Sequence, residues 1–332
     1  INLVVNSAAS TKGVQATTEE SMVRLTATNN LLIDVTGADG AIAVHNRSAA
    51  GKVELAGNDV KIHATATDGQ VYGIQSETKS DVKISGNTVE IGTTGGKNGN
   101  NGEIGSAALY AKNSNIEVDA NKVVVNTTNA TEHAFAVYSN GGSAITLGKD
   151  ANSEVQISSS SKGTALGVAV ASTGKQAPDG SKVIIHGAKI NVSAEGKTAR
   201  GLYAQDNNKI SVGDTGSDIQ ISAKGEDAIG VLALEHGSVD LNGKNAVIKA
   251  EGSGSQASEG IHVQNNDMTD QDHRATVNVN TENTTIHADS ALVAMSHSVL
   301  NVNSNLVTNG KNAILTRGNS DVNINMDGEH TT

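Results

Sequence analysis

A four-residue signature recurs eleven times along the chain, with the form Gly or Ala, large apolar, variable, small. The copies are GVQA from Gly13, AIAV from Ala41, GIQS from Gly73, ALYA from Ala108, AFAV from Ala134, GVAV from Gly167, GLYA from Gly201, GVLA from Gly230, GIHV from Gly260, ALVA from Ala291 and AILT from Ala313. Successive copies start 22 to 35 residues apart, with a mean period of 30. A repeat of this length is typical of a solenoid, in which each unit buries its apolar side against its neighbours.

Each copy is followed by two more segments that alternate apolar and polar residues. The apolar pairs of the second segment are Val23 and Leu25, Val53 and Leu55, Val82 and Ile84, Ile116 and Val118, Ile145 and Leu147, Val183 and Ile185, Ile210 and Val212, Val239 and Leu241, Val277 and Val279, Leu300 and Val302, and Val322 and Ile324. Those of the third are Val60 and Ile62, Val89 and Ile91, Val123 and Val125, Val155 and Ile157, Ile190 and Val192, and Ile219 and Ile221. A spacing of two residues indicates a strand with one buried face. The third pattern blurs after Ile248, where Ala250 and Ala288 take the apolar positions, and Ile184 departs from the polar middle position of the second.

The segments between these strands are rich in Gly, Asn, Ser, Thr and Asp, which suits turns. No stretch carries an apolar stripe with a 3.6-residue period, so we expect almost no helix. The sequence therefore predicts an all-β fold, a parallel β-helix of about eleven rungs with three short strands each. Because parallel crossovers are strongly biased to one hand, we expect a right-handed coil, about 50 Å long. No compositional break divides the chain, so residues 1–332 form one domain.

The amino-acid composition narrows the range of possible functions. Hydrophobic residues make up 36% of the chain but aromatic residues only 2%, which fits a narrow core of stacked Val, Ile and Leu. The formal charge of −11 and the absence of a basic patch with interleaved aromatic residues argue against nucleic-acid binding. There is no cysteine, and therefore neither a disulfide framework nor thiol chemistry.

The strand openings resemble those of a known family. The Gly/Ala–apolar–x–small signature, the continuations NSNIEV, NNKISV and HGSVDL, and the Asn/Gly/Ser/Thr-rich turns are similar to the passenger domain of monomeric autotransporters. The nearest in style are the self-associating AIDA-type adhesins. This resemblance implies a non-enzymatic bacterial cell-surface protein that acts in attachment to host or bacterial surfaces, aggregation and biofilm formation. It implies as partner a glycan or protein receptor, or a second copy of the chain, and membrane anchoring through a C-terminal β-barrel.

The ends of the sequence bear on its extent. It begins inside an apolar run, INLVV, without Met or a signal peptide, and stops part-way through a rung. We expect a passenger fragment from which the signal peptide and the C-terminal translocator barrel are absent. A related interpretation is a two-partner secretion exoprotein, which has a similar rod.

Two other functions remain open. Parallel β-helices also carry polysaccharide lyases and hydrolases, whose sites need clustered carboxylates on adjacent rungs. The polygalacturonase-type NTD, DD, HG and RIK motifs are absent as a set, although His186-Gly187 and His236-Gly237 occur. We therefore predict no catalytic residues and no cofactor. The third function is a structural stalk that holds a distal binding domain away from the surface.

Two clusters are candidates for ion binding. His236, His262 and His297 lie on or just after the first strand of successive rungs, where they suit either a metal site or solvated turns. Asp267, Asp270 and Asp272 lie close together in the segment NNDMTDQDHRAT, which suits calcium or a solvated acidic loop. The histidine offsets differ and the aspartate cluster offers few ligands, so we predict no metal site.

The variable third column of the signature is the best guide to a binding face. Columns two and four are apolar or small and are expected to point inward, so column three points to solvent. That column, taken from the copies above, reads Gln15, Ala43, Gln75, Tyr110, Ala136, Ala169, Tyr203, Leu232, His262, Val293 and Leu315, and the next outward position adds Tyr138, Leu234, Met295 and Arg317. We predict a partner-binding face of Tyr110, Tyr138, Tyr203, Leu232, Leu234, His262, Val293, Met295 and Leu315. The alternative is that another part of the protein covers this apolar strip.

Insertions and asparagines complete the pattern. The insertions lie at 92–106, 171–182 (with the only proline, Pro178) and 265–276, and they suit either recognition or flexible spacing. Asparagines of the turns are expected to stack into polar ladders that stabilise the rod edge; they are Asn113, Asn115, Asn140, Asn207, Asn208 and Asn265.

Overall fold

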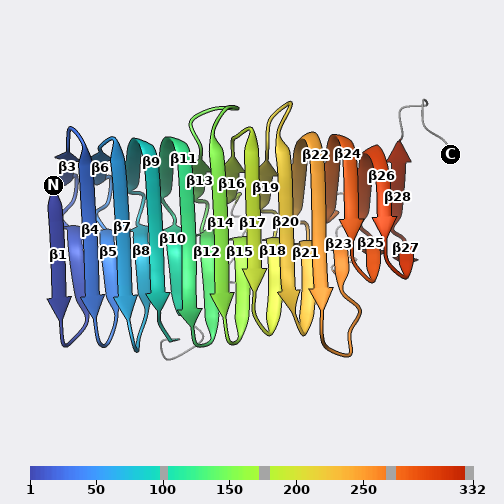
Figure 1. Cartoon of the computed structure of the whole chain (residues 1–332), viewed down its shortest axis with the longest axis horizontal. Coiled ribbons are helices and arrows are strands. Elements are labelled where there is room, and N and C mark those ends of the chain that lie inside the picture. Colours follow the sequence, from blue (N-terminus) through green and yellow to red (C-terminus); the bar gives the residue numbers. More distant parts are fainter. Residues whose placement is uncertain (98–103, 172–179, 267–273, 326–332) are drawn as a thin grey trace.

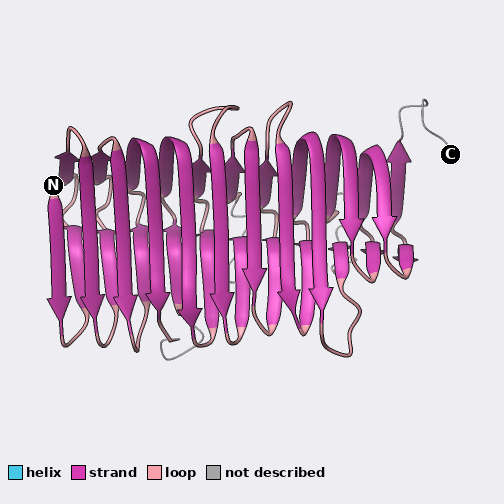
Figure 2. Cartoon of the chain, in the orientation of Figure 1, coloured by secondary structure: helices cyan, strands magenta, loops and turns pink. Residues whose placement is uncertain are grey.

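The chain coils into a rod of parallel strands, which confirms the predicted β-helix. The computed structural model describes residues 1–97, 104–171, 180–266 and 274–325, and these contain strands and turns but no helix. Every strand pairs in parallel with the equivalent strand of a neighbouring turn (Figures 1 and 2). Within these described ranges there is accordingly no helix long and apolar enough to cross a membrane.

The signature segments form one sheet of eleven strands, called here the signature sheet. Its strands are β2 (Thr11–Ala16), β5 (Ala41–Asn46), β8 (Val71–Glu77), β10 (Ser106–Lys112), β12 (His133–Asn140), β15 (Thr164–Val170), β18 (Thr198–Gln205), β21 (Asp227–Leu234), β23 (Glu259–Gln264), β25 (Ser290–Met295) and β27 (Asn312–Arg317). Each pairs with the signature strand before and after it, so one column of the repeat becomes one row along the rod.

The second and third segments share a sheet of seventeen strands, called here the wide sheet. Second-segment strands are β3 (Met22–Thr26), β6 (Lys52–Ala56), β13 (Ala144–Leu147), β16 (Lys182–Ile185), β19 (Lys209–Val212) and β28 (Asp321–Asn325), and third-segment strands are β1 (Asn2–Ser7), β4 (Asn30–Gly37), β7 (Asp59–Ala66), β14 (Glu154–Ser161), β17 (Lys189–Glu195) and β20 (Asp218–Gly225). Five long strands run through both segments: β9 (Asp81–Gly95), β11 (Asn115–Ala130), β22 (Ser238–Gly252), β24 (Thr276–His287) and β26 (Val299–Asn309). We expected the second and third segments to form separate strands. In these five turns the chain bends between the two segments without ending the strand.

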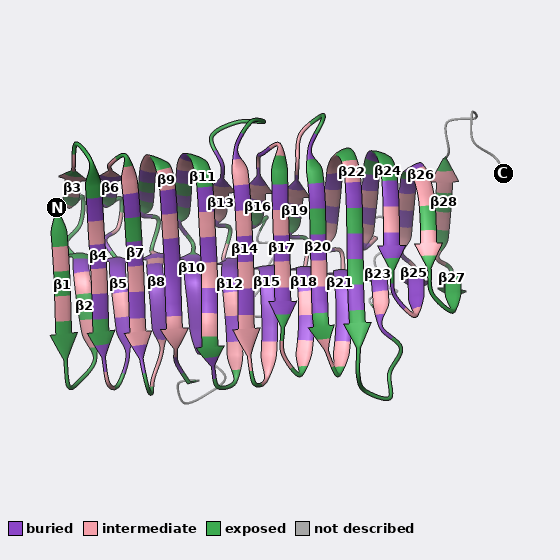
Figure 3. Cartoon of the chain, in the orientation of Figure 1, coloured by how far each residue is buried: buried purple, intermediate pink, exposed green. Residues whose placement is uncertain are grey.

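Aliphatic side chains from the two sheets fill the interior. The predicted inward pairs are buried through the middle of the rod, and only those of the first and last turns are partly exposed (Figure 3). No aromatic ring belongs to this core cluster. The glycines of column one explain how the sheets approach so closely: a Cβ at Gly230 would lie 2.5 Å from Ile248 Cγ2 and 2.7 Å from the Gly260 carbonyl oxygen. The small first residue of the signature is therefore a packing requirement.

The register corrects two of the eleven copies. Val44 pairs with Val14 and Ile74, so the second copy begins at Ala43 and reads AVHN. The same shift of two residues makes the fifth copy AVYS, which begins at Ala136. AIAV and AFAV carry a small residue at both candidate starts, so the pattern alone does not separate them. Ala43 and Ala136 are fully buried at the glycine position, and His45 and Tyr138 hold column three instead.

Polar ladders run along a buried corner of the rod. The backbone N–H of Ser114 donates to Ser143 Oγ at 3.0 Å, that of Ser143 to Ser181 Oγ at 3.2 Å, and that of Ser181 to Asn208 Oδ1 at 2.9 Å. Side-chain oxygens thus satisfy backbone donors that turn from one sheet to the other.

Only some of the asparagines that we expected in polar ladders form them. Asn208 ends the corner ladder, and Asn115 Nδ2 donates to Asp81 Oδ1 at 2.9 Å. Asn113 and Asn207 have left-handed backbone angles, with φ of 53° and 60°. Asn140 is buried, and its side-chain amide has no hydrogen-bond partner in the described part of the chain, so it takes no part in a hydrogen-bonded ladder there. Asn265 is also fully buried.

Candidate binding surfaces

All five aromatic residues of the chain lie on the outer face of the signature sheet. They form an outer cluster with their own small core, separate from the aliphatic interior; its members include Tyr72, Tyr110, Phe135, Tyr138, Leu166 and Tyr203. Tyr72 stacks on Tyr110 with ring centroids 5.4 Å apart, and Tyr110 stacks on Tyr138 at 5.7 Å and 12°. Phe135 packs against Tyr138 at 5.0 Å. One-rung spacing therefore turns three tyrosines into a continuous stack.

This cluster is buried, which corrects the expectation of an exposed face. Tyr110 is 7% exposed and Tyr138 is 8% exposed. The Tyr72 hydroxyl donates to the Ile104 carbonyl at 3.2 Å and the Tyr138 hydroxyl to that of Ala171 at 3.5 Å, so both reach the flanks of the first two insertions. Ile104 and Ala171 also pack on the cluster. The centres of all three insertions, with Pro178, Asp267, Asp270 and Asp272, lie outside the described residues.

The remaining residues of the predicted partner-binding face lie in adjacent rows on the same sheet. Leu232, His262, Val293 and Leu315 continue column three in register. The position two residues on in each strand holds Leu234 and Met295. Leu232 is 6% exposed and Val293 fully buried, whereas the other four are partly exposed. The structure places these residues together but offers little apolar surface among them.

Polar side chains beside the apolar rows make hydrogen bonds with one another. Arg200 Nη2 donates to Asp227 Oδ2 at 2.6 Å, and His262 Nδ1 lies 2.5 Å from Glu259 Oε2. The Tyr203 hydroxyl donates to Gln205 Oε1. Burial, reinforced by the nearby carboxylates of Asp206 and Glu235, raises the pKa of Tyr203 to about 12. Tyr203 is therefore a neutral hydrogen-bond donor at physiological pH.

The three histidines of the possible ion site do not converge. His236 and His297 occupy left-handed turns, with φ of 69° and 60°, while His262 lies within β23. Within the described residues no group of three or more His, Cys, Asp or Glu side chains is arranged to hold a metal ion.

The wide sheet presents a charge ladder on the outer face of its first turns. Arg24, Glu54, Lys83 and Glu117 occupy one row on successive strands, with alternating sign. Arg24 Nε donates to Glu54 Oε2 at 2.7 Å, and Lys83 Nζ to Glu117 Oε1 at 2.8 Å. The Arg24 guanidinium lowers the pKa of Glu54 by this hydrogen bond. Neighbouring turns are held together, and the row carries no net charge.

The last turns replace charges with side-chain amides. Three ladders run in parallel across the wide sheet, two from β22 through β24 and β26 to β28 and one from β20 through β22 and β24 to β26. In each, the later residue donates its Nδ2 to the oxygen of the earlier one. They are Asp240–Asn278–Asn301–Asn323, Asn242–Asn280–Asn303–Asn325 and Asp218–Asn245–Asn283–Asn305, with distances of 2.7 to 3.4 Å. Their amides make a polar face of fixed geometry.

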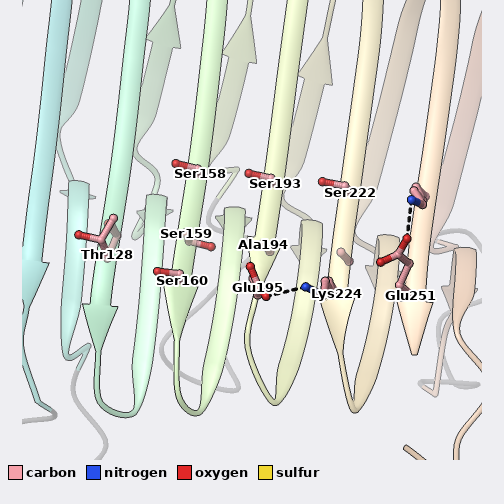
Figure 4. A pocket seen from close by; sticks show the side chains of 13 residues that line it. Thr128, Ser158, Ser159, Ser160, Ser193, Ala194, Glu195, Ser222, Lys224 and Glu251 are labelled. Atoms are coloured by element: carbon pink, nitrogen blue, oxygen red, sulfur yellow. Dashed lines mark hydrogen bonds and ion pairs between the residues drawn. The ribbon is translucent and has the colours of Figure 1, made fainter. Parts of the chain in front are cut away.

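A groove crosses the third-segment strands in the middle of the rod. It has a volume of about 330 Å³ and runs over β11, β14, β17, β20 and β22 (Figure 4). One wall is a row of in-register serines, Ser158, Ser193 and Ser222. The other carries Thr128 and then the row Ser160, Glu195, Lys224 and Glu251. Polar side chains therefore form both walls of the groove, and Ala194 and Ala223 also line it.

The sequence contained a signal for these polar rows. Asn278, Asn301 and Asn323 each sit between the members of an apolar pair, and the same residue type at one place in consecutive units indicates an outward row. The serine row lies in the third segments, just beyond their apolar pairs, and was not predicted as a site.

Comparison with known proteins identifies no relative. No protein-family model, no curated protein and no solved structure matches the chain.

Proposed function

We propose that this chain is a non-enzymatic adhesion rod, the passenger of an autotransporter of the AIDA type, that attaches to host or bacterial surfaces through its wide sheet. One observation carries the proposal: the outer face of that sheet repeats the same polar groups in register over successive turns, as the three amide ladders do. Weak contacts repeated at a fixed spacing add up to strong attachment when two surfaces meet.

Burial of the aromatic cluster supports the choice of the wide sheet. Tyr110 and Tyr138 of the cluster offer little surface to a partner, and neither does Val293 further along the same sheet. The charge ladder, the groove and the amide face all lie on the wide sheet, and many of their side chains are exposed or half-exposed.

The state of the groove carboxylates supports a non-enzymatic role. A general acid needs a carboxyl whose pKa is raised toward neutrality. Glu195 accepts from Lys224 Nζ at 2.9 Å, and the Lys249 ammonium lowers the pKa of Glu251. Two charge-compensated carboxylates suit binding better than proton transfer.

Surface display tests the proposal. The rod is fused to an unrelated surface anchor on a non-aggregating cell, and settling and attachment to host cells and matrix proteins are measured. We expect faster settling or firmer attachment than with the anchor alone. The double variant Thr146→Arg with Ser211→Arg obstructs the wide sheet on half-exposed positions and is expected to abolish the gain. The matched control, Gln15→Arg with Thr17→Arg, changes exposed positions at the signature sheet and should keep it.

Two results would contradict adhesion by this segment. Displayed cells that behave like the anchor control would leave the rod without a binding role. Full attachment by a longer protein from which this segment has been deleted would make the rod a stalk.

A further inference from the structure

We propose that the groove of Figure 4 binds a linear, uncharged polysaccharide lying along the rod axis. This inference rests on the proposed adhesive function, to which it adds a site and a ligand class. It is carried by the spacing of the groove walls, their hydrogen-bonding capacity and their charge balance.

The first argument is the period of the walls. Ser158, Ser193 and Ser222 pair across adjacent strands, so their hydroxyls recur at about 4.8 Å along the axis. The second wall lies two residues further along each strand, at a distance of roughly 7 Å. A ligand that meets every turn must itself repeat at that interval, and an extended chain of pyranose units is such a polymer, with hydroxyls on both edges.

The second argument is unused hydrogen-bonding capacity. The Ser158 and Ser222 hydroxyls make no hydrogen bond within the described ranges, and Ser193 Oγ makes only a long one, 3.5 Å, to the Ile157 carbonyl. The half-exposed hydroxyls of this row are therefore available to exchange hydrogen bonds with water or with a ligand.

The third argument is charge. Glu195 is paired with Lys224, and Glu251 with Lys249, which continues the serine row, so the two walls together carry two positive and two negative groups. The whole chain has a net charge of −11. A sulfated or carboxylated polymer gains no net attraction here, whereas a neutral glycan can use both the ammonium donors and the carboxylate acceptors.

No aromatic residue of the described part of the chain lines the groove, so we expect a low affinity for a single oligosaccharide. Hydrogen bonds exchanged with water are weak individually, so one oligosaccharide should bind with a dissociation constant on the order of 1 mM. Display of many rods on a cell multiplies these contacts.

Saturation-transfer NMR on the soluble chain tests the site, with cellohexaose as the extended neutral glycan and maltohexaose, which curves away from a straight axis, as its comparison. We expect transfer to cellohexaose and at least tenfold less to maltohexaose. The triple variant Ser158→Val, Ser193→Val and Ser222→Val removes the hydroxyls, places residues that favour strands at these positions, and should bind cellohexaose at least tenfold more weakly. The Ser→Thr triple variant at the same positions retains the hydroxyls and should restore binding.

The control is Gln15→Val with Thr17→Val, at exposed positions outside the groove, which should bind like the unmodified chain; circular dichroism checks that each variant is folded. The inference is overturned if the Val triple variant binds cellohexaose as well as the unmodified chain, or if the unmodified chain does not bind cellohexaose. It is also overturned if the groove binds an unfolded polypeptide but no glycan. Failure of the adhesive function has a different signature: displayed rods that do not attach, although the soluble chain binds cellohexaose.

Discussion

Asn301 donates its Nδ2 to Asn278 Oδ1 at 2.8 Å and accepts a hydrogen bond of the same length from Asn323 Nδ2. Each ladder therefore has a direction. Asp240, which can only accept, begins this one, and Asn242 begins its neighbour by accepting from Asn280 at 3.1 Å. A carboxylate is compatible with the start of a ladder but not with its middle.

The direction predicts that the same substitution has unequal effects at the start and in the middle of a ladder. Asn301→Asp places an oxygen against Asn278 Oδ1 and removes a donor, so we expect the free energy of unfolding to fall by about 1–2 kcal/mol. Asn242→Asp keeps the acceptor that Asn280 needs and should change stability by less than about 0.5 kcal/mol. Urea unfolding of both variants at neutral pH measures this, and equal losses would show that the ladder has no polarity.

Close sheet packing predicts a large cost at column one. In Gly230→Ala the new Cβ would lie 2.5 Å from Ile248 Cγ2, which forces the two sheets apart. We expect a loss of about 2–3 kcal/mol, in the range of overpacked cores. Gly57→Ala is the matched control, since its nearest neighbour is the Asn29 carbonyl oxygen at 3.2 Å, and it should lose less than half as much. Thermal unfolding followed by circular dichroism compares the two.

The core positions could be predicted from the sequence, because the two-residue spacing of apolar side chains is a local property of the chain. Val183 and Ile185 must face the same side of a strand, and both are buried. The second and fifth copies could not be aligned in the same way. Ala41 and Ala43 fit the small first position equally well, and only the pairing of Ala41 with Val71 and of Val44 with Ile74 on the next strand separates them.

The burial of the aromatic face depends on contacts between residues that are distant in sequence. Column three gave the outward direction of Tyr110 correctly, but outward in a solenoid means outside the coil and does not mean solvent-exposed. Insertion flanks at Ile104 and Ala171 pack there. Nothing in the four-residue signature carries that information.

Backbone strain at one turn predicts a stabilising change. Thr78 has a φ of 64°, a left-handed conformation that a β-branched residue rarely adopts. Thr78→Asn should raise the free energy of unfolding by about 0.5–1 kcal/mol, because asparagine tolerates this region. Thr17→Asn, at an exposed position directly after β2 without a positive φ, serves as control and should have no such effect. An unchanged melting temperature for Thr78→Asn would mean that the turn carries little strain.

An arginine clamps the last described turn to the turns before it. Arg274 Nη1 lies 2.6 Å from Asp321 Oδ2, and Nη2 donates to the carbonyls of Ser298 at 2.7 Å and Asn319 at 3.1 Å. Lysine lacks this planar fork, so Arg274→Lys should speed amide exchange in β28 by about tenfold and leave β14 unchanged. Lys311→Ala, which removes an ion pair made by a mostly exposed lysine, should leave both strands unaffected. Uniform acceleration along the rod would show that the arginine supports more than its own turn.

The raised pKa of Tyr203 predicts a loss of stability in alkali. The folded protein holds this proton to a pKa of about 12, whereas an unfolded tyrosine releases it near about 10. The stabilisation is therefore complete below pH 10 and is lost as the pH rises toward 12, a decrease of about 2 kcal/mol. Tyr203→Phe has no such proton, and its stability should fall less over this interval. Phenolate absorbance during alkaline titration locates the pKa, and denaturant midpoints at several pH values measure the stability. If Tyr203 ionises near pH 10, and the stability of the two proteins changes with pH in parallel, burial does not hold the proton.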